Sequence, residues 1–244
     1  MSYLKDLESS WNKLGQKDPL WAISTDPSKK NNKWDLDDFF NSGIREIDAL
    51  MEYIEGLQIP IRTKKALDFG CGVGRLTQAL ASYFDVVEGI DIAPSMVELA
   101  RKLNRYGDRC KYHVNPNIDL YLYDDEVFDL IYTSYVLQHI RTDYSKKYIK
   151  ELLRILAPDG ILVFSMLSTA NTLFGEFHFV VKYPLQRIYA RVYSKLKGSV
   201  MESHFIKRDQ LIQLLEANGA KLIDITEITE TKYWHNSRYC VVKA

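Results

Sequence analysis

The chain has 244 residues, of which 46% are hydrophobic, and its 32 basic and 32 acidic residues give a formal net charge of zero. This length can bury a full α/β core, and the neutral balance leaves no electrostatic footprint for a nucleic-acid partner. Its cysteines are odd in number, widely spaced and without a C-x-x-C pair, which argues against a zinc site and favours a reducing compartment: Cys71, Cys110 and Cys240. No apolar stretch resembles a signal peptide or is long enough to span a bilayer, so we expect a cytoplasmic protein.

The first 43 residues hold three of the four tryptophans, Trp11, Trp21 and Trp34. Turn-forming pairs at Asp18-Pro19 and Asp26-Pro27 indicate loops in this part of the chain. Large aromatic side chains in a short arm need another part of the protein to pack against. We expect Trp11 to plug the flank of the main domain, whereas Trp21 and Trp34 could either do the same or cover a bound ligand.

Apolar residues then recur at helical spacing and predict an α-helix before the first strand: Ile44, Ile47, Leu50, Met51 and Ile54. We therefore divide the chain into an N-terminal helical arm or cap, residues 1–60, and a main domain, residues 61–244.

Residues 65–91 have the pattern of a strand, a glycine turn, a helix, a second strand and an acid. The apolar run from Ala66 to Phe69 is typical of a buried parallel strand. Gly70 and Gly72 let the backbone turn sharply and approach a ligand without a Cβ in the way. Asp91 ends the second strand, where a carboxylate can accept hydrogen bonds from both hydroxyls of a ribose. The unit is predicted to hold an adenosine.

The glycine spacing is G-x-G-x-G, with Arg75 where the dinucleotide fingerprint requires its third glycine, so a pyrophosphate is not indicated. A turn of this kind with an acid at the next strand end resembles the class I S-adenosylmethionine-dependent methyltransferases, whose cofactor has no phosphate. The resemblance covers most of residues 60–244. It implies S-adenosyl-L-methionine as the cofactor and S-adenosyl-L-homocysteine as the product. No metal is expected, because no His/Asp/Glu cluster has ligand spacing.

The resemblance also implies which residues around the first two strands bind the cofactor. They are Asp68, Gly70 and Gly72 in the turn, Asp91 at the ribose, and Ile92 and Met96 beside the adenine. Met96 could instead be an ordinary core residue.

A third strand, Lys111 to Val114, leads into the loop 115–119. Family members usually carry Asp-Ala in this loop, and counting back from Phe128-Asp129 places Asn117 and Ile118 there, so this sequence departs from the pattern. The Asn117 side-chain oxygen could accept from the adenine amino group, and the Ile118 N–H could serve a ring nitrogen. The alternative is that the Asn-Pro-Asn stretch only forms a turn. The Asn/Asp-Pro-Pro-Tyr/Phe motif of nucleic-acid amino-methyltransferases follows the fourth strand, so modification of a nucleic-acid base is not supported.

Residues 127–134 resemble the fourth strand of the family, and residues 135–140 its following turn. In the resemblance Ser134 holds the methionine amino group through its backbone carbonyl. His139 lies where many small-molecule methyltransferases carry a histidine, and its near-neutral pKa suits a general base. A structural histidine that orders the loop is the alternative.

The remaining pattern completes a doubly wound α/β fold. It predicts helices at 146–156 and 209–218, a buried strand at 161–166, and closing strands at 220–228 and 238–242, which form an antiparallel hairpin at the sheet edge in this family. The predicted fold class is a mostly parallel seven-stranded sheet, Rossmann-like, with the N-terminal helical arm and an insertion after the fifth strand.

The insertion, about residues 168–208, lies where class I methyltransferases commonly carry a lid. It is aromatic, and residues 168–210 contain seven basic and three acidic residues. The surplus positive charge could be a solvated face, a site for an anionic substrate, or a helix in weak contact with a membrane surface.

These features predict an S-adenosylmethionine-dependent methyltransferase that acts on an oxygen or nitrogen atom of a small metabolite, which could be anionic. Positioning of the reactants and exclusion of water would supply most of the catalysis, and a base would add to it. A protein-modifying enzyme and a non-catalytic cofactor-binding subunit that activates a partner are the alternatives.

Overall fold

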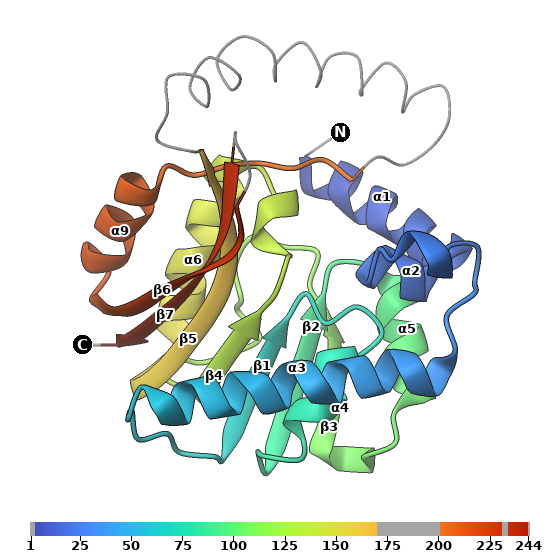
Figure 1. Ribbon diagram of the computed structural model, residues 1–244, viewed down its shortest axis with the longest axis horizontal. Helices are drawn as coiled ribbons and strands as arrows, with labels where there is room; N and C mark the ends of the chain where they lie inside the picture. The colour runs from blue at the N-terminus through green and yellow to red at the C-terminus, as the bar shows by residue number, and fades with distance from the viewer. Residues whose placement is uncertain (1–2, 170–200, 231–233, 244) are drawn as a thin grey trace, which may run out of the picture.

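The structure is a computed structural model and describes residues 3–169, 201–230 and 234–243. Figure 1 shows a central sheet with the long helix α3 across one face and the N-terminal helices α1 and α2 beyond one end of the strands. The arm consists of α1 (Tyr3–Lys17), α2 (Pro19–Ile23), the 3₁₀ helix η1 (Pro27–Lys29) and α3 (Leu36–Gly56).

The arm is more helical than its Asp-Pro pairs indicated. Pro19 and Pro27 each begin a helix, at a position where the missing N–H has no helical partner to lose. Asp26 caps η1 by accepting the Ser28 N–H at 2.8 Å. The Asp-Pro pairs that were expected to mark loops therefore mark the starts of helices.

Strands and helices alternate through the rest of the chain. In chain order they are β1 (Lys65–Phe69), α4 (Arg75–Leu80), β2 (Val86–Asp91), α5 (Pro94–Leu103), η2 (Gly107–Arg109), β3 (Cys110–Val114), β4 (Phe128–Thr133), η3 (Leu137–His139), α6 (Thr142–Ile155), β5 (Leu156–Thr169), α9 (Arg208–Glu216), β6 (Ala220–Glu230) and β7 (Trp234–Lys243).

The seven strands form one sheet in the order β3-β2-β1-β4-β5-β7-β6. The first five are parallel to one another, whereas β7 runs antiparallel to both β5 and β6. The side on which the chain adds strands to the sheet changes at β1. Strands β2 and β3 lie on one side of β1, and the next strand, β4, lies on the other. Ligands of open α/β sheets bind at such a point, beyond the carboxyl ends of the strands.

Successive residues of each strand face opposite sides of the sheet, and each side has its own core. Leu67 of β1 and Phe164 of β5 belong to the cluster under α6 and α9. Ala66 and Val163 belong to the cluster under α3, α4 and α5. The sheet is thus covered on both faces, which fixes the positions of the strand ends.

The predicted fold class is confirmed: a mostly parallel seven-stranded sheet, an antiparallel hairpin at its edge and a helical N-terminal arm. Most of the expected insertion lies outside the described residues. Of its ends, Ser168 and Thr169 extend β5, and residues 201–207 lead into α9.

Candidate functional site

The turn after β1 is tied to β2 and packed closely by two other segments. Gly70 donates its N–H to the Ile90 carbonyl oxygen at 2.8 Å. Gly70 and Gly72 have positive φ angles, 79° and 54°, which glycine tolerates best. A Cβ on Gly70 would collide with the Val136 side chain, and one on Gly72 would lie 2.5 Å from Ile23 Cδ1. The turn needs glycine for its backbone and for both contacts.

Asp91, at the end of β2, is bonded to the same turn. Its Oδ2 atom accepts the Gly72 N–H at 2.9 Å, and its Oδ1 atom accepts the Ala93 N–H at 2.8 Å. Burial raises the pKa of Asp91, and these N–H bonds act in the opposite direction. The Ile92 N–H also bonds this carboxylate, whose two oxygens have about four acceptor sites in all. The carboxylate therefore keeps capacity to accept from a ligand hydroxyl while it holds the turn.

Asp68 lies beneath the turn and is only 2% exposed. Its Oδ2 atom accepts a hydrogen bond from Thr77 Oγ1 at 2.6 Å, which joins β1 to α4. Burial raises the pKa of Asp68 to about 7, although the Thr77 bond lowers it. Asp68 is not part of the cavity wall, so the contacts it makes brace the turn from below.

A cavity of about 660 Å³ lies over the glycine turn and the carboxyl ends of β2 and β4, which is an ordinary volume for a small-molecule site. The predicted site residues in its wall are Gly70, Gly72, Asp91, Ile92, Met96, Ser134 and His139. Residues from three separate parts of the chain thus meet around one space.

In the loop after β3, Asn115 lines the cavity, whereas Asn117 and Ile118 do not. Asn115 donates its Nδ2–H groups to the carbonyl oxygens of Asn117 and Asp119, at 3.1 and 2.9 Å. The Asn117 carbonyl oxygen also accepts the Tyr148 hydroxyl at 2.7 Å. Asn115 therefore orders the loop, and adenine recognition by Asn117 and Ile118 stays a prediction.

The N-terminal arm supplies another part of the wall. Leu7 and Trp11 of α1, Ala22 and Ile23 of α2, and the following Ser24 and Thr25 line the cavity. Trp11 was expected to plug the flank of the domain, and it lies in the cavity wall.

Trp34, which was expected either to pack on the domain or to cover a bound ligand, lies outside the cavity wall. It donates its Nε1–H to the Ser24 carbonyl oxygen at 3.1 Å and packs edge-on against Phe39. It therefore supports the wall from behind through Ser24. Trp21 also lies outside the wall and donates to the Asp26 carbonyl oxygen.

His139, at the end of η3, is held on two sides. Its Nδ1 atom lies 2.8 Å from the Glu202 carbonyl oxygen, and its ring meets Trp11 edge-on with centroids 5.5 Å apart. A carbonyl oxygen can only accept, so Nδ1 carries the proton and a neutral ring has its lone pair on Nε2, 3.4 Å from the Gln138 side-chain amide nitrogen. Burial lowers the pKa of His139, which favours this neutral form.

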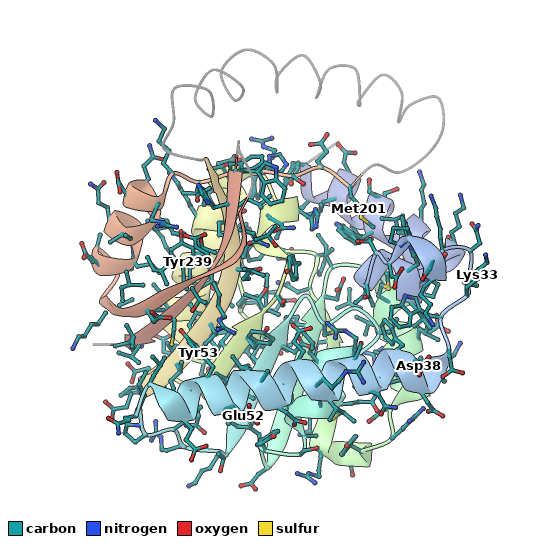
Figure 2. The ribbon with its side chains drawn as sticks, viewed as in Figure 1. Lys33, Asp38, Glu52, Tyr53, Met201 and Tyr239 are labelled. Atoms are coloured by element: carbon teal, nitrogen blue, oxygen red, sulfur yellow. The ribbon has the colours of Figure 1, made fainter. Side chains whose placement is uncertain are left out.

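The segment after residue 200 approaches the same turn. The His204 N–H donates to the Gln138 carbonyl oxygen at 2.7 Å, and the Ile206 N–H donates to the Leu167 carbonyl oxygen at 3.1 Å. Met201 lines the cavity and lies beside α1 in Figure 2. The returning chain is therefore anchored to both η3 and β5.

Sequence reasoning missed a polar part of the wall formed by Ser42 and Glu46 of α3 and Arg75 of α4. Arg75 lies 2.6 Å from Glu46 and 3.3 Å from Ser42. The available signal was Arg75 directly after the glycine turn, together with two polar residues four apart on the otherwise apolar face of α3.

Within residues 3–169, 201–230 and 234–243, no group of three or more His, Cys, Asp or Glu side chains is placed to hold a metal ion. No helix in this described part of the chain is long and apolar enough to cross a membrane. The three cysteines are buried and unpaired.

Comparison with known proteins agrees with this geometry. Residues 67–164 match the family described as methyltransferase domain. The chain is 30% identical over 185 residues to a ubiquinone biosynthesis O-methyltransferase of Coxiella burnetii, covering 73% of this chain and 72% of that one. It is 23% identical over 189 residues to the ajmaline N-methyltransferase of Rauvolfia serpentina, covering 75% of this chain and 62% of that one.

The fold is similar to that of the magnesium protoporphyrin IX methyltransferase of Synechocystis PCC 6803, solved with S-adenosylhomocysteine bound. The TM-score is 0.63 at 18% identity, and the match covers 98% of this chain and 99% of that one. The chain therefore belongs to the class I S-adenosylmethionine-dependent methyltransferases and uses S-adenosylmethionine as its cofactor.

Proposed function

We propose that this methyltransferase transfers the methyl group to a hydroxyl oxygen of a small acceptor, and that His139 removes the hydroxyl proton. The observation that carries the proposal is the hydrogen bond from His139 Nδ1 to the Glu202 carbonyl oxygen, at 2.8 Å. It leaves Nε2 as the acceptor atom of a neutral ring in the cavity wall.

A base matters more for a hydroxyl than for an amine. A neutral amine attacks through its own lone pair and can lose its proton afterwards, whereas a hydroxyl becomes a strong nucleophile only as its proton leaves. The burial that lowers the pKa of His139 keeps the ring neutral at neutral pH. Oxygen is thus the better match to this site, and the Coxiella relative is named as an O-methyltransferase.

The surroundings of His139 favour an acceptor with an apolar body. Leu7, Trp11, Ile140 and Met201 line the same cavity. Burial of apolar surface against these side chains would supply binding energy, and His139 would orient the hydroxyl. The proposed anionic character of the acceptor depends on basic residues of the insertion, most of which lie outside the described residues.

In this mechanism the cofactor supplies an activated methyl group on a sulfonium centre. The protein holds adenosine at Asp91 and the glycine turn, keeps water away with α1 and α2, and orients the acceptor oxygen. A further factor of roughly 10² to 10⁴ would come from proton removal by His139. Asn117 and Ile118 at the adenine and the Ser134 carbonyl at the methionine amino group complete the proposed contacts.

The test is a comparison of wild-type protein with His139→Gln. Cell extract is incubated with cofactor that carries a labelled methyl group, and labelled metabolites are separated and identified. We expect a labelled methyl ether, and we expect His139→Gln to lower kcat by roughly 10² to 10⁴ with little change in S-adenosylhomocysteine affinity. The acid limb of the wild-type kcat/KM profile should lie below the ordinary histidine pKa.

Four outcomes contradict the proposal. A labelled amine would replace oxygen by nitrogen as the acceptor atom. Equal loss of turnover and cofactor affinity in His139→Gln would make His139 a loop-ordering residue. Label recovered in protein would indicate a protein-modifying enzyme, and cofactor binding without any labelled product would indicate a non-catalytic subunit.

A further inference from the structure

The polar part of the cavity wall lies on the opposite side of the glycine turn from Asp91. We propose that Arg75 and Glu46 bind the two charged groups at the amino-acid end of the cofactor, Arg75 its carboxylate and Glu46 its ammonium. The inference rests on the proposed function only for the identity of the cofactor and not for the acceptor or His139.

The first observation is that the two side chains form a charged pair inside the cavity wall. Arg75 Nη2 lies 2.6 Å from Glu46 Oε2, and their side chains are 11% and 28% exposed. Both residues line the cavity. A buried ion pair is weak evidence for a stabilising role, because removing two charges from water offsets much of their attraction. A charged ligand group beside the pair would recover part of that cost.

The second observation is that the pair retains hydrogen-bonding capacity. Among the residues that the structure describes, Glu46 Oε1 accepts the Tyr132 hydroxyl alone, at 2.9 Å, and each carboxylate oxygen can accept twice. Arg75 has five N–H donors; one binds Glu46 and one binds Ser42. Its Nε atom is buried without a partner among the described residues. Free donors and free lone pairs are therefore present at the same place.

The third observation is the position of the pair in the sheet. Asp91 is at the end of β2, Arg75 follows the turn after β1, and Tyr132, which holds Glu46, is on β4. These strands are adjacent in the order β2-β1-β4. A cofactor with its ribose at Asp91 and its sulfonium centre over the glycine turn extends its amino-acid end toward β4. One positive and one negative side chain match that zwitterion.

The pair also shares the cavity wall with Ser134, for which we proposed a carbonyl contact to the ammonium group. Ser134 follows β4 two residues after Tyr132 and lines the same cavity. An ammonium group has three donors, so it can bind the carbonyl oxygen and the Glu46 carboxylate at once.

The experiment compares two ligands that differ only at the end in question. S-adenosyl-L-homocysteine carries the amino-acid end, whereas 5′-deoxy-5′-methylthioadenosine has the same adenosine and sulfur without it. Calorimetry gives the affinity of each ligand for wild-type protein, Glu46→Gln and Arg75→Lys. The matched control is Glu52→Gln, which removes one charge from an exposed position of the same helix (Figure 2).

We expect Glu46→Gln to weaken S-adenosylhomocysteine binding about tenfold or more and to leave methylthioadenosine binding within about twofold. Arg75→Lys should show the same selectivity, because lysine keeps the charge but loses the fork that matches a carboxylate. Glu52→Gln should change neither affinity.

Methylthioadenosine also reports whether each variant keeps a folded adenosine site. Equal loss of both ligands in Glu46→Gln and Arg75→Lys would make the pair a structural brace and overturn the inference. Unchanged affinity for both ligands would overturn it as well. Neither result depends on methyl transfer, so this inference and the role proposed for His139 can fail separately.

Discussion

At the residue scale, Asp91 combines two tasks that sequence reasoning had assigned to separate parts of the motif. The carboxylate was expected at the ribose, and the glycines were expected to form the turn by themselves. The structure joins them, because Asp91 accepts the Gly72 N–H at 2.9 Å. The acid therefore fixes the backbone that surrounds it before any ligand arrives, which lowers the ordering cost of binding.

This dual role gives a prediction for Asp91→Asn. The amide keeps one acceptor oxygen, but it loses the charge and the other acceptor oxygen. We expect S-adenosylhomocysteine affinity, measured by calorimetry, to fall at least about tenfold. Methylthioadenosine affinity should fall by a similar factor, because both ligands carry the ribose.

Asp108→Asn, an exposed aspartate of η2, is the control and should not change either affinity. An unchanged affinity in Asp91→Asn, or tighter binding of a nicotinamide dinucleotide than of S-adenosylhomocysteine, would contradict the assignment of Asp91 to the ribose.

At the element scale, a charged cluster joins three adjacent strands of the sheet. Glu88 of β2 is 2.7 Å from Lys65 Nζ of β1 and 2.9 Å from His113 Nε2 of β3. Burial raises the pKa of Glu88, but the contacts with His113 and Lys65 outweigh it and lower the pKa to about 2. The depressed pKa means that the folded state prefers the ionised carboxylate.

The sign of the pH effect follows from this direction. Because the folded-state pKa is below the ordinary value of 4.5, the stabilisation is present above about pH 4.5 and is lost as the pH falls toward about 2. We expect Glu88→Gln to lower the free energy of unfolding at pH 7 by about 2 kcal/mol, allowing for solvent screening at Lys65 and His113. The difference from wild type should shrink on acidification.

Urea unfolding at a series of pH values measures this effect. Glu98→Gln is the control, since its ion pair with Lys102 has both side chains 67% exposed and should contribute little. If the loss of unfolding free energy in Glu88→Gln stays constant down to about pH 3, the substitution removes packing and not a charge interaction.

Sequence patterns predicted the elements well where one periodic signal dominated. Strand β1, helix α3 and the hairpin of β6 and β7 all lie close to the residues at which apolar patterns predicted them. The pattern was less informative in the arm, where Asp-Pro pairs mark helix starts as readily as loops. Periodicity also could not tell that Trp11 lines the cavity and that Trp34 stands behind it, because that depends on how α1 packs against the domain.

For the candidate site, sequence patterns likewise predicted one part and missed another. Local motifs located the glycine turn, Asp91 and His139, since the residues of each motif are near one another in the chain. The contact of Glu46 with Arg75 joins residues 29 apart, and that of His139 with Glu202 joins residues 63 apart. Such contacts follow from tertiary packing and have no signature in the spacing of a single sequence.

At the scale of the whole molecule, the cavity is completed by two segments that are far apart in the chain. α1 and α2 come from the first 25 residues, and Met201 and Glu202 come from the segment that returns before α9. Figure 1 shows the N-terminal helices next to this returning segment. The parts that complete the site are therefore outside the βαβ core that carries the cofactor motif.

Cofactor binding should consequently be detected in the arm as well as in the core. We expect hydrogen exchange of residues 20–25, 70–74 and 134–140 to slow when S-adenosylhomocysteine is added, since all three stretches contribute to the cavity wall. Ligand at 100 times its Kd stabilises the fold by about 2.7 kcal/mol, so every region that exchanges through global unfolding slows to a similar extent.

α9 and β6, which contribute no residue to the cavity wall, measure that common slowing. Additional protection of residues 20–25 is the expected result. Protection confined to the glycine turn and β2 would mean that the arm does not cover the bound cofactor.

The hydrogen bond between Ile206 and Leu167 has a consequence for how this enzyme could diversify. It ties the segment that returns before α9 to β5, and the same segment holds η3 through Glu202 and His204. The closure entropy of the chain between these anchors changes only slowly with its length. A lineage could therefore exchange residues 170–200 as a cassette while the anchors keep the geometry of η3. Such an exchange would change which acceptor binds, while the residues that bind the cofactor would stay the same.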